Sequence, residues 1–149
     1  MIRRRVLEAF AGAGVLCLLL SGCSGTAAAG TDDLPTFTSM DQLVSAVDEH
    51  LSCDTDPAGD PVTPMNGDAL PTDQVLCLPH VQIDLYGDQA ALDKALDLWS
   101  DTQQGPVPLV HGGNWMVVDL TGVATGEPSA VDLEGLASEM DVEYEIVAT

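Results

Sequence analysis

Residues 107–120 have the sequence VPLVHGGNWMVVDL, in which two apolar runs flank the segment at 111–114. Gly112 and Gly113 can adopt the positive φ angles that a tight, primed turn between two strands requires. The stretch therefore predicts a β-hairpin. A hairpin excludes an all-parallel sheet and directs the fold towards antiparallel pairing.

Three helices are predicted around this hairpin, because apolar residues recur there every three or four positions. The first begins at Ser39 and ends near Leu51. The second begins with Asp88 as its N-cap and is stopped by Gly105, with proline following. A short third helix is predicted within residues 131–140.

Further strands are predicted on both sides of the second helix. Residues 81–86 alternate between apolar and polar side chains, which is typical of a strand with one buried face. Pro79 cannot donate to a sheet ladder, so it predicts either a bend between two strands or an edge position. A final strand is predicted at 142–146. We therefore expect an α+β domain whose mainly antiparallel sheet has two to three helices packed on one face.

The first residues have the parts of an export signal. Arg3, Arg4 and Arg5 form a positive segment, and residues 6–20 form an apolar segment interrupted only by Glu8. This segment is shorter than the roughly 20 apolar residues that span a bilayer. A processed signal is therefore favoured over a permanent anchor helix, and the basic residues leave the export route open.

Leu20-Ser21-Gly22-Cys23 matches the lipobox of bacterial lipoproteins, and the chain resembles that family. The resemblance implies that residues 1–22 are a signal peptide and that Cys23 carries lipid, such as palmitate, at the outer face of the cytoplasmic membrane. The alternative is an ordinary secretory signal that is cleaved near residues 27–29, with Cys23 discarded.

The residues after the lipobox are small and polar, which predicts a flexible tether over residues 23–36. Residues 37–149 then form a single domain, because removal of a 22-residue leader leaves 127 of the 149 residues.

Two cysteines stay available for a disulfide in this interpretation. Cys17 leaves with the leader and Cys23 is acylated, so Cys53 and Cys77 form a pair in an oxidising compartment. A redox pair or metal ligands are the alternatives, but no Cys-x-x-Cys spacing supports them. The domain is therefore expected to contain one disulfide.

A second resemblance combines the lipobox, an early helix that ends near Cys53, a second cysteine in a strand, and Gly-Asn-Trp at 113–115. In this pattern the chain is similar to small uncharacterised lipoproteins of actinobacteria. The resemblance implies location and architecture, and it carries no activity.

The mature chain is strongly acidic. Three of the four Lys and Arg residues lie in the leader, which leaves Lys94, while only Glu8 of the 24 acidic residues is removed. The resulting net charge of about −22 repels phosphate backbones, so nucleic acid is excluded as a partner.

Metal and catalytic motifs are weak. Residues 54–60 begin like a calcium loop, but Ala58 and Met65 stand where ligands belong. The three histidines, His50, His80 and His111, lack the short spacing of metal motifs. The chain offers no Gly-x-Ser-x-Gly motif and no free cysteine once the bridge forms, so we expect no enzyme, no metal and no cofactor.

Two aromatic residues were candidates for binding. Trp99 lies on the apolar face of the second helix and is expected in the core. Trp115 begins a strand after the glycine turn, so it either packs in the core or faces a partner together with His111.

These observations favour a non-enzymatic interaction module that is anchored to the membrane and presents its acidic surface to an envelope protein. The alternative is a lipoprotein that binds a small ligand or a divalent cation through the loop at 54–73.

The lipobox interpretation makes a direct prediction about processing. We expect protein from the membrane fraction to begin at Cys23 and to carry two or three acyl chains, which is enough for stable anchoring. Intact mass spectrometry measures this. A mass without acyl chains, for a chain that starts near Gly30, would contradict it.

Overall fold

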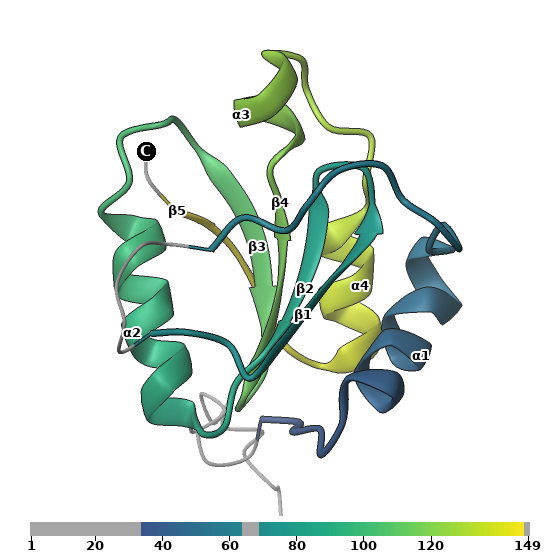
Figure 1. Ribbon diagram of the computed structural model, residues 1–149, viewed down its shortest axis with the longest axis vertical. Helices are drawn as coiled ribbons and strands as arrows, with labels where there is room; N and C mark the ends of the chain where they lie inside the picture. Colours follow the sequence, from purple (N-terminus) through teal and green to yellow (C-terminus); the bar gives the residue numbers. More distant parts are fainter. Residues whose placement is uncertain (1–33, 64–68, 148–149) are drawn as a thin grey trace, which may run out of the picture.

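A computed structural model describes residues 34–63 and 69–147. Figure 1 shows the sheet in the middle of the molecule, with helices on either side of it. The elements in chain order are α1 (Met40–Leu51), β1 (Asp73–Leu78), β2 (Val81–Leu85), α2 (Gln89–Ser100), β3 (Val107–His111), β4 (Trp115–Asp119), α3 (Thr121–Thr125), α4 (Leu133–Met140) and β5 (Glu143–Val147).

The five strands form one antiparallel sheet in the order β1-β2-β4-β3-β5. The predicted hairpin is present as β3 and β4, and the predicted bend at Pro79 separates β1 from β2. The register pairs Leu85 with Trp115 at one end and Val81 with Asp119 at the other. The start of the domain lies at the Leu85–Trp115 end of the sheet, and a cavity lies at the Val81–Asp119 end.

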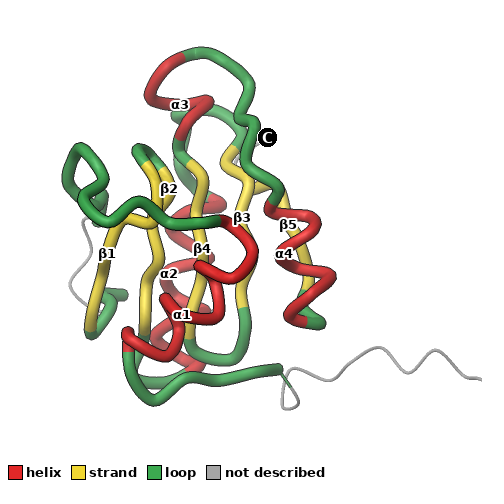
Figure 2. The backbone as a smooth tube through the Cα atoms, turned by 90° about the vertical axis from the view of Figure 1, so that its right-hand side faces the viewer, coloured by secondary structure: helices red, strands yellow, loops and turns green. Residues whose placement is uncertain are grey.

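Helices cover both faces of the sheet. Helices α1 and α4 pack on one face, which confirms the expectation of two to three helices there, and α2 packs on the opposite face (Figures 1 and 2). The physical reason lies in β2 and β4, in which every residue is buried. A strand with two buried faces needs a cover on each side.

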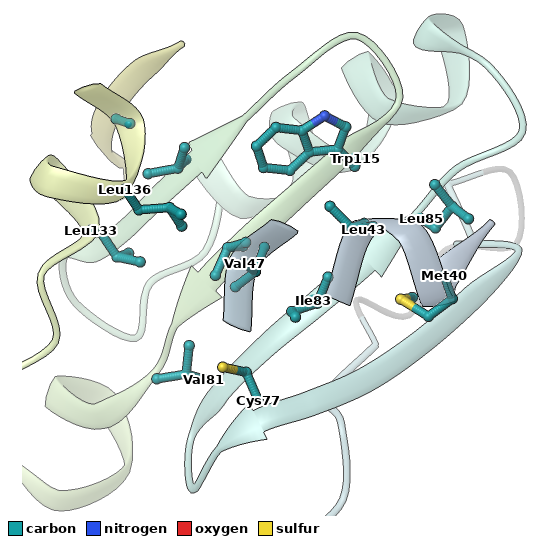
Figure 3. Packing of buried hydrophobic residues seen from close by; sticks show 13 residues of the cluster. Met40, Leu43, Val47, Cys77, Val81, Ile83, Leu85, Trp115, Leu133 and Leu136 are labelled. Carbon is teal, nitrogen blue, oxygen red and sulfur yellow. The ribbon is translucent and has the colours of Figure 1, made fainter. Parts of the chain in front are cut away.

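The core beneath α1 and α4 is built from alternate residues of the central strands. Figure 3 shows Leu43 and Val47 of α1 lying against Ile83 of β2, while Leu136 comes from α4. The other face carries a second cluster, in which Leu92, Ala95 and Trp99 of α2 meet Leu109, Met116 and Val118.

The helices begin where the sequence predicts them. Ser39 Oγ accepts a hydrogen bond from Gln42 N at 3.4 Å, and Asp88 Oδ1 accepts one from Ala91 N at 2.9 Å. The end of α2 is less well predicted, because the helix stops at Ser100, before the expected Gly105. The short helix α3 was not predicted.

The hairpin turn does not use the conformation we predicted for its glycines. Neither Gly112 nor Gly113 is among the positive-φ residues of the described chain. A methyl group on Gly113 would instead lie 2.7 Å from Thr36 Cγ2, and one on Gly112 would lie 2.5 Å from Pro35 O. Glycine is required here because residues 35–36 approach closely and, at Gly112, because the Trp115 indole also lies against the backbone.

That segment is the beginning of the domain. Pro35 O accepts hydrogen bonds from Gly113 N and from Trp115 Nε1, both at 2.9 Å. Asn114 joins the same junction, since its Nδ2 donates to Phe37 O and its Oδ1 accepts from Phe37 N. Residues 34–36, which we assigned to the tether, therefore contact the domain.

The predicted disulfide between Cys53 and Cys77 is present. It joins the chain just after α1 to β1, with a Cα–Cα distance of 4.5 Å and a sequence separation of 24 residues. Asp54 N also donates to Cys77 O at 2.8 Å. The bridge closes the loop between α1 and β1, which crosses the sheet in front of its strands in Figure 1.

Removal of this bridge should lower stability by about 3 kcal/mol, because the unfolded chain regains the conformational freedom of a closed loop. The double variant Cys53→Ala, Cys77→Ala tests this by urea unfolding, alongside wild type with and without reductant. The double variant should not respond to reductant. Equal midpoints for oxidised and reduced wild type would contradict the prediction.

Candidate functional site

A cavity of about 590 Å³ lies at the end of the sheet where β2 begins and β4 ends. The end of α2, helix α3, the β1–β2 turn and residues 58–63 surround it. Its lining is mainly apolar and includes Val62, Leu76, Leu98, Trp99, Leu120 and Val123. Its polar lining includes Asp60, Thr63, His80, Gln82, Asp101 and Gln104. This size and composition are typical of small-molecule sites.

Two hydrogen bonds connect elements around the cavity. Leu120 N donates to His80 O at 2.7 Å, which ties the end of β4 to the β1–β2 turn. Asp119 Oδ1 accepts from the backbone N of Thr121, the first residue of α3, at 2.9 Å. His80 has a φ of 68°, in the left-handed region, and lines the cavity.

The loop side of the cavity is held by one buried amide. Gln82 is fully buried, and its Oε1 accepts from Val62 N at 2.8 Å while its Nε2 donates to Val62 O at 3.0 Å. The side chain thus bonds to Val62 as a neighbouring strand would. Thr63 Oγ1 donates to Gln74 Oε1 at 2.9 Å and extends the attachment to β1.

A buried carboxylate continues this network along β2. Gln82 Nε2 also donates to Asp84 Oδ2 at 2.9 Å, and Tyr86 Oη approaches the same oxygen at 3.5 Å. Burial raises the pKa of Asp84 to about 6, although hydrogen bonds from Gln74, Gln82 and Tyr86 act in the opposite direction. Burial, and then the charge of Asp84, raises the pKa of Tyr86.

Two buried polar atoms lack a hydrogen-bond partner within the described ranges, namely Asp84 Oδ1 and Trp99 Nε1. A buried donor without an acceptor lowers stability unless water or a ligand supplies one. Trp99 also lines the cavity, so a ligand oxygen there would have the right chemistry to accept from its indole N–H.

Trp115 and His111, the two possible partner-facing residues, do not line the cavity. The Trp115 side chain is fully buried against Phe37, with ring centroids 5.7 Å apart, so the idea that it faces a partner is wrong. The turn at residues 112–114 contacts the start of the domain, which covers the indole. The His111 side chain is 15% exposed, and its Nε2 lies 3.7 Å from Glu145 Oε1.

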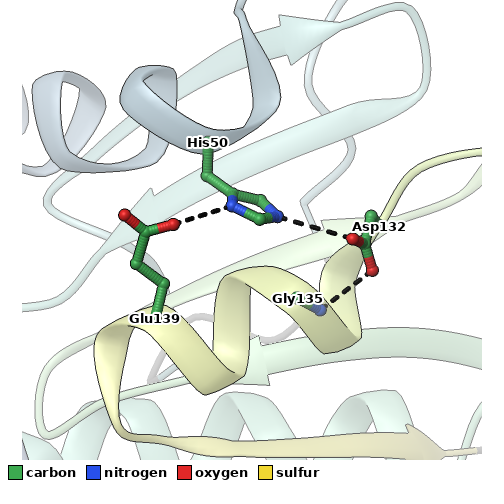
Figure 4. A network of polar contacts seen from close by, with 4 residues as sticks. All are labelled: His50, Asp132, Gly135 and Glu139. Carbon is green, nitrogen blue, oxygen red and sulfur yellow. Dashed lines mark hydrogen bonds and ion pairs between the residues drawn. The ribbon is translucent and has the colours of Figure 1, made fainter.

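The three histidines do not converge on one site. His50, at the end of α1, bonds through Nδ1 to Glu139 Oε2 at 2.8 Å, and its Nε2 lies 3.7 Å from Asp132 Oδ2 (Figure 4). Its ring therefore links α1 to α4. Across residues 34–63 and 69–147, no three His, Cys, Asp or Glu side chains are grouped so that they could hold a metal ion.

Other predicted features fall outside the described residues. Cys23 and most of the tether lie there, as do Met65 and the middle of the loop at 54–73. None of the helices in the described part of the chain is long and apolar enough to cross a bilayer.

Comparison of the chain with family models, with curated proteins and with solved structures gave no match.

The sequence pattern missed the polar residues of the site. The alternation in 81–86 predicted an exposed face that carries Gln82, Asp84 and Tyr86, yet all three are buried beneath α2 or the loop. The sequence of β4 could have predicted this burial, because its unbroken apolar run Trp-Met-Val-Val indicates a strand with two buried faces. Because β4 pairs with β2, burial of both faces of β2 follows.

The raised pKa of Asp84 predicts a pH-dependent effect of Asp84→Asn. Between pH 3.8 and about pH 6, the Asp84 carboxyl takes up a proton when the chain folds, because its pKa is higher in the folded state. Its contribution to stability is therefore full below about pH 4 and is lost above about pH 6. We expect the variant to raise the free energy of unfolding by roughly 1–3 kcal/mol near pH 7, because each unit of pKa is worth about 1.4 kcal/mol. Near pH 4 the gain should shrink.

Urea unfolding of Asp84→Asn and wild type at both pH values measures this difference. The matched control is Asp93→Asn, which changes an exposed carboxylate on α2. A stability difference for Asp84→Asn that is independent of pH would contradict the prediction.

Proposed function

We propose that this chain is a lipid-anchored extracytoplasmic domain that binds a small, mainly apolar ligand in the cavity beside α2 and α3. The cavity is the observation that supports this. Its volume of about 590 Å³, its apolar walls and its few polar groups fit a ligand site better than a defect in packing.

The interaction-module hypothesis now has weaker support. It was based on the acidic surface, with Trp115 and His111 as possible partner-facing residues, and the Trp115 side chain is inside the core. The acidic surface can still steer the approach of a charged partner protein, but it does not identify where that partner would dock. A small ligand is therefore the better-supported partner.

The proposed role is binding without catalysis. Among the described residues, the lining contains no cysteine, serine or lysine, and its hydroxyl groups belong to Thr102 and to Thr63, which donates to Gln74. Within the same residues, the ionisable side chains Asp60, His80 and Asp101 come from three separate segments and form no hydrogen bond or ion pair with one another. No nucleophile and base are paired in the way that covalent catalysis requires.

Filling the cavity should abolish binding. Ala124 and Thr102 line it from α3 and from the end of α2, so Ala124→Trp and Thr102→Trp each place an indole where the ligand would lie. We expect either variant to weaken the binding of the neutral fluorescent probe N-phenyl-1-naphthylamine. Its Kd should rise by about tenfold or more, which corresponds to about 1.4 kcal/mol of binding free energy. Fluorescence titration measures the affinity.

The titration uses the mature chain, residues 23–149 with Cys23→Ser, because both core clusters and the disulfide lie within it. Ala90→Trp is the matched control, since Ala90 is exposed on α2 and does not line the cavity. Circular dichroism checks that each variant is folded. Unchanged probe affinity in both filled variants would overturn the proposal.

A further inference from the structure

The charges around the cavity all favour one kind of ligand. In the described part of the chain, its ionisable lining consists of Asp60, Asp101 and His80, with neither lysine nor arginine. Lys94, the one basic residue that the mature chain keeps, is exposed on α2 and does not line the cavity. An anionic group would therefore lose water without gaining a strong counter-charge, which is unfavourable.

The two carboxylates lie where a charged group can stay hydrated. Asp60 and Asp101 are both exposed and come from different segments, the loop before β1 and the end of α2. The deeper lining is apolar and includes Leu98, Leu120 and Trp99. This arrangement fits a ligand whose apolar body lies inside and whose polar end remains at the mouth.

Helix α2 adds to the same preference. Its last residues, Leu98 and Trp99, line the cavity together with Asp101 and Thr102 just beyond the helix. The C-terminal end of a helix carries partial negative charge that favours cations, and the last turn of α2 contains no basic residue.

We propose that the cavity selects hydrophobic amines, with the alkyl or aryl body between α2, α3 and the loop and the ammonium group beside Asp60 and Asp101. This inference depends on the proposed function, since it names the ligand class for the same cavity. The proposed ligand is a monovalent organic cation, and the test below compares it with a neutral apolar ligand.

Three eight-carbon ligands that differ only at the polar end provide that test: octylammonium, 1-octanol and octanoate. Binding to the mature Cys23→Ser chain is followed by the indole N–H signals in ¹⁵N-labelled protein at physiological salt, which screens distant charges. Trp99 lines the cavity, while Trp115 lies under the other face of the sheet and serves as an internal reference.

We expect octylammonium to bind about three- to tenfold more tightly than 1-octanol, because two partly exposed ion pairs contribute modestly. Octanoate should bind most weakly. The double variant Asp60→Asn, Asp101→Asn should remove the advantage of octylammonium and leave 1-octanol unchanged. The control Asp93→Asn, Asp97→Asn removes the same charge from exposed positions of α2 outside the cavity and should keep the advantage.

Each contrary result has a separate meaning. Equal affinities for octylammonium and 1-octanol would overturn the ligand class while the proposed site stands. If the preference for octylammonium over 1-octanol falls equally in both double variants, the preference comes from the overall charge of the domain. That result would also overturn this inference. If no ligand shifts the Trp99 signal and the filled variants bind the naphthylamine probe normally, the proposed function itself fails.

Discussion

The hydrogen bonds between Gln82 and Val62 hold the site together. A single side-chain amide replaces the paired backbone groups of a strand and fixes residues 58–63 against β2, on the face that α2 covers. The same amide donates to Asp84, so the loop, the sheet and the buried carboxylate form one network. Buried polar networks of this kind favour a single arrangement because each unsatisfied group is costly. The loop wall of the cavity is therefore attached to the sheet through buried groups, although Val62 itself is largely exposed.

The disulfide acts on the same loop from its other end. It fixes the chain after α1 to β1, and Gln82 fixes it again at Val62. Between these two attachments the chain passes from the face of α1 to the face of α2. A loop that is tied at two points can form a preorganised wall, which lowers the entropy lost when a ligand binds.

Local signals in the sequence predicted much of this fold. The caps at Ser39 and Asp88, the bend at Pro79 and the pairing of Cys53 with Cys77 depend on neighbouring residues or on simple elimination, and the structure contains all of them. The placement of α2 on the second face could not be predicted in this way, because the pattern of a helix does not state which side of a sheet it covers. The burial of Gln82 and Asp84 likewise depends on a loop that is distant in sequence.

The turn glycines show how a local rule can give the right element for the wrong reason. A hairpin was predicted at 111–114 because glycine permits positive φ, and a hairpin is present. Gly112 and Gly113 are instead needed so that residues 34–36 can approach. The contact that requires them spans almost 80 residues, which places it beyond any pattern in the turn itself.

The attachment of residues 34–37 to the β3–β4 turn has a consequence for orientation. That turn is at the Leu85–Trp115 end of the sheet, whereas the cavity opens at the Val81–Asp119 end, about 15 Å away along five-residue strands. In the proposed lipid-anchored form, the chain towards an acylated Cys23 would leave the domain beside the turn, at the end of the sheet opposite the cavity. The tether would then be attached far from the mouth of the cavity and would leave that end of the domain free to receive a ligand.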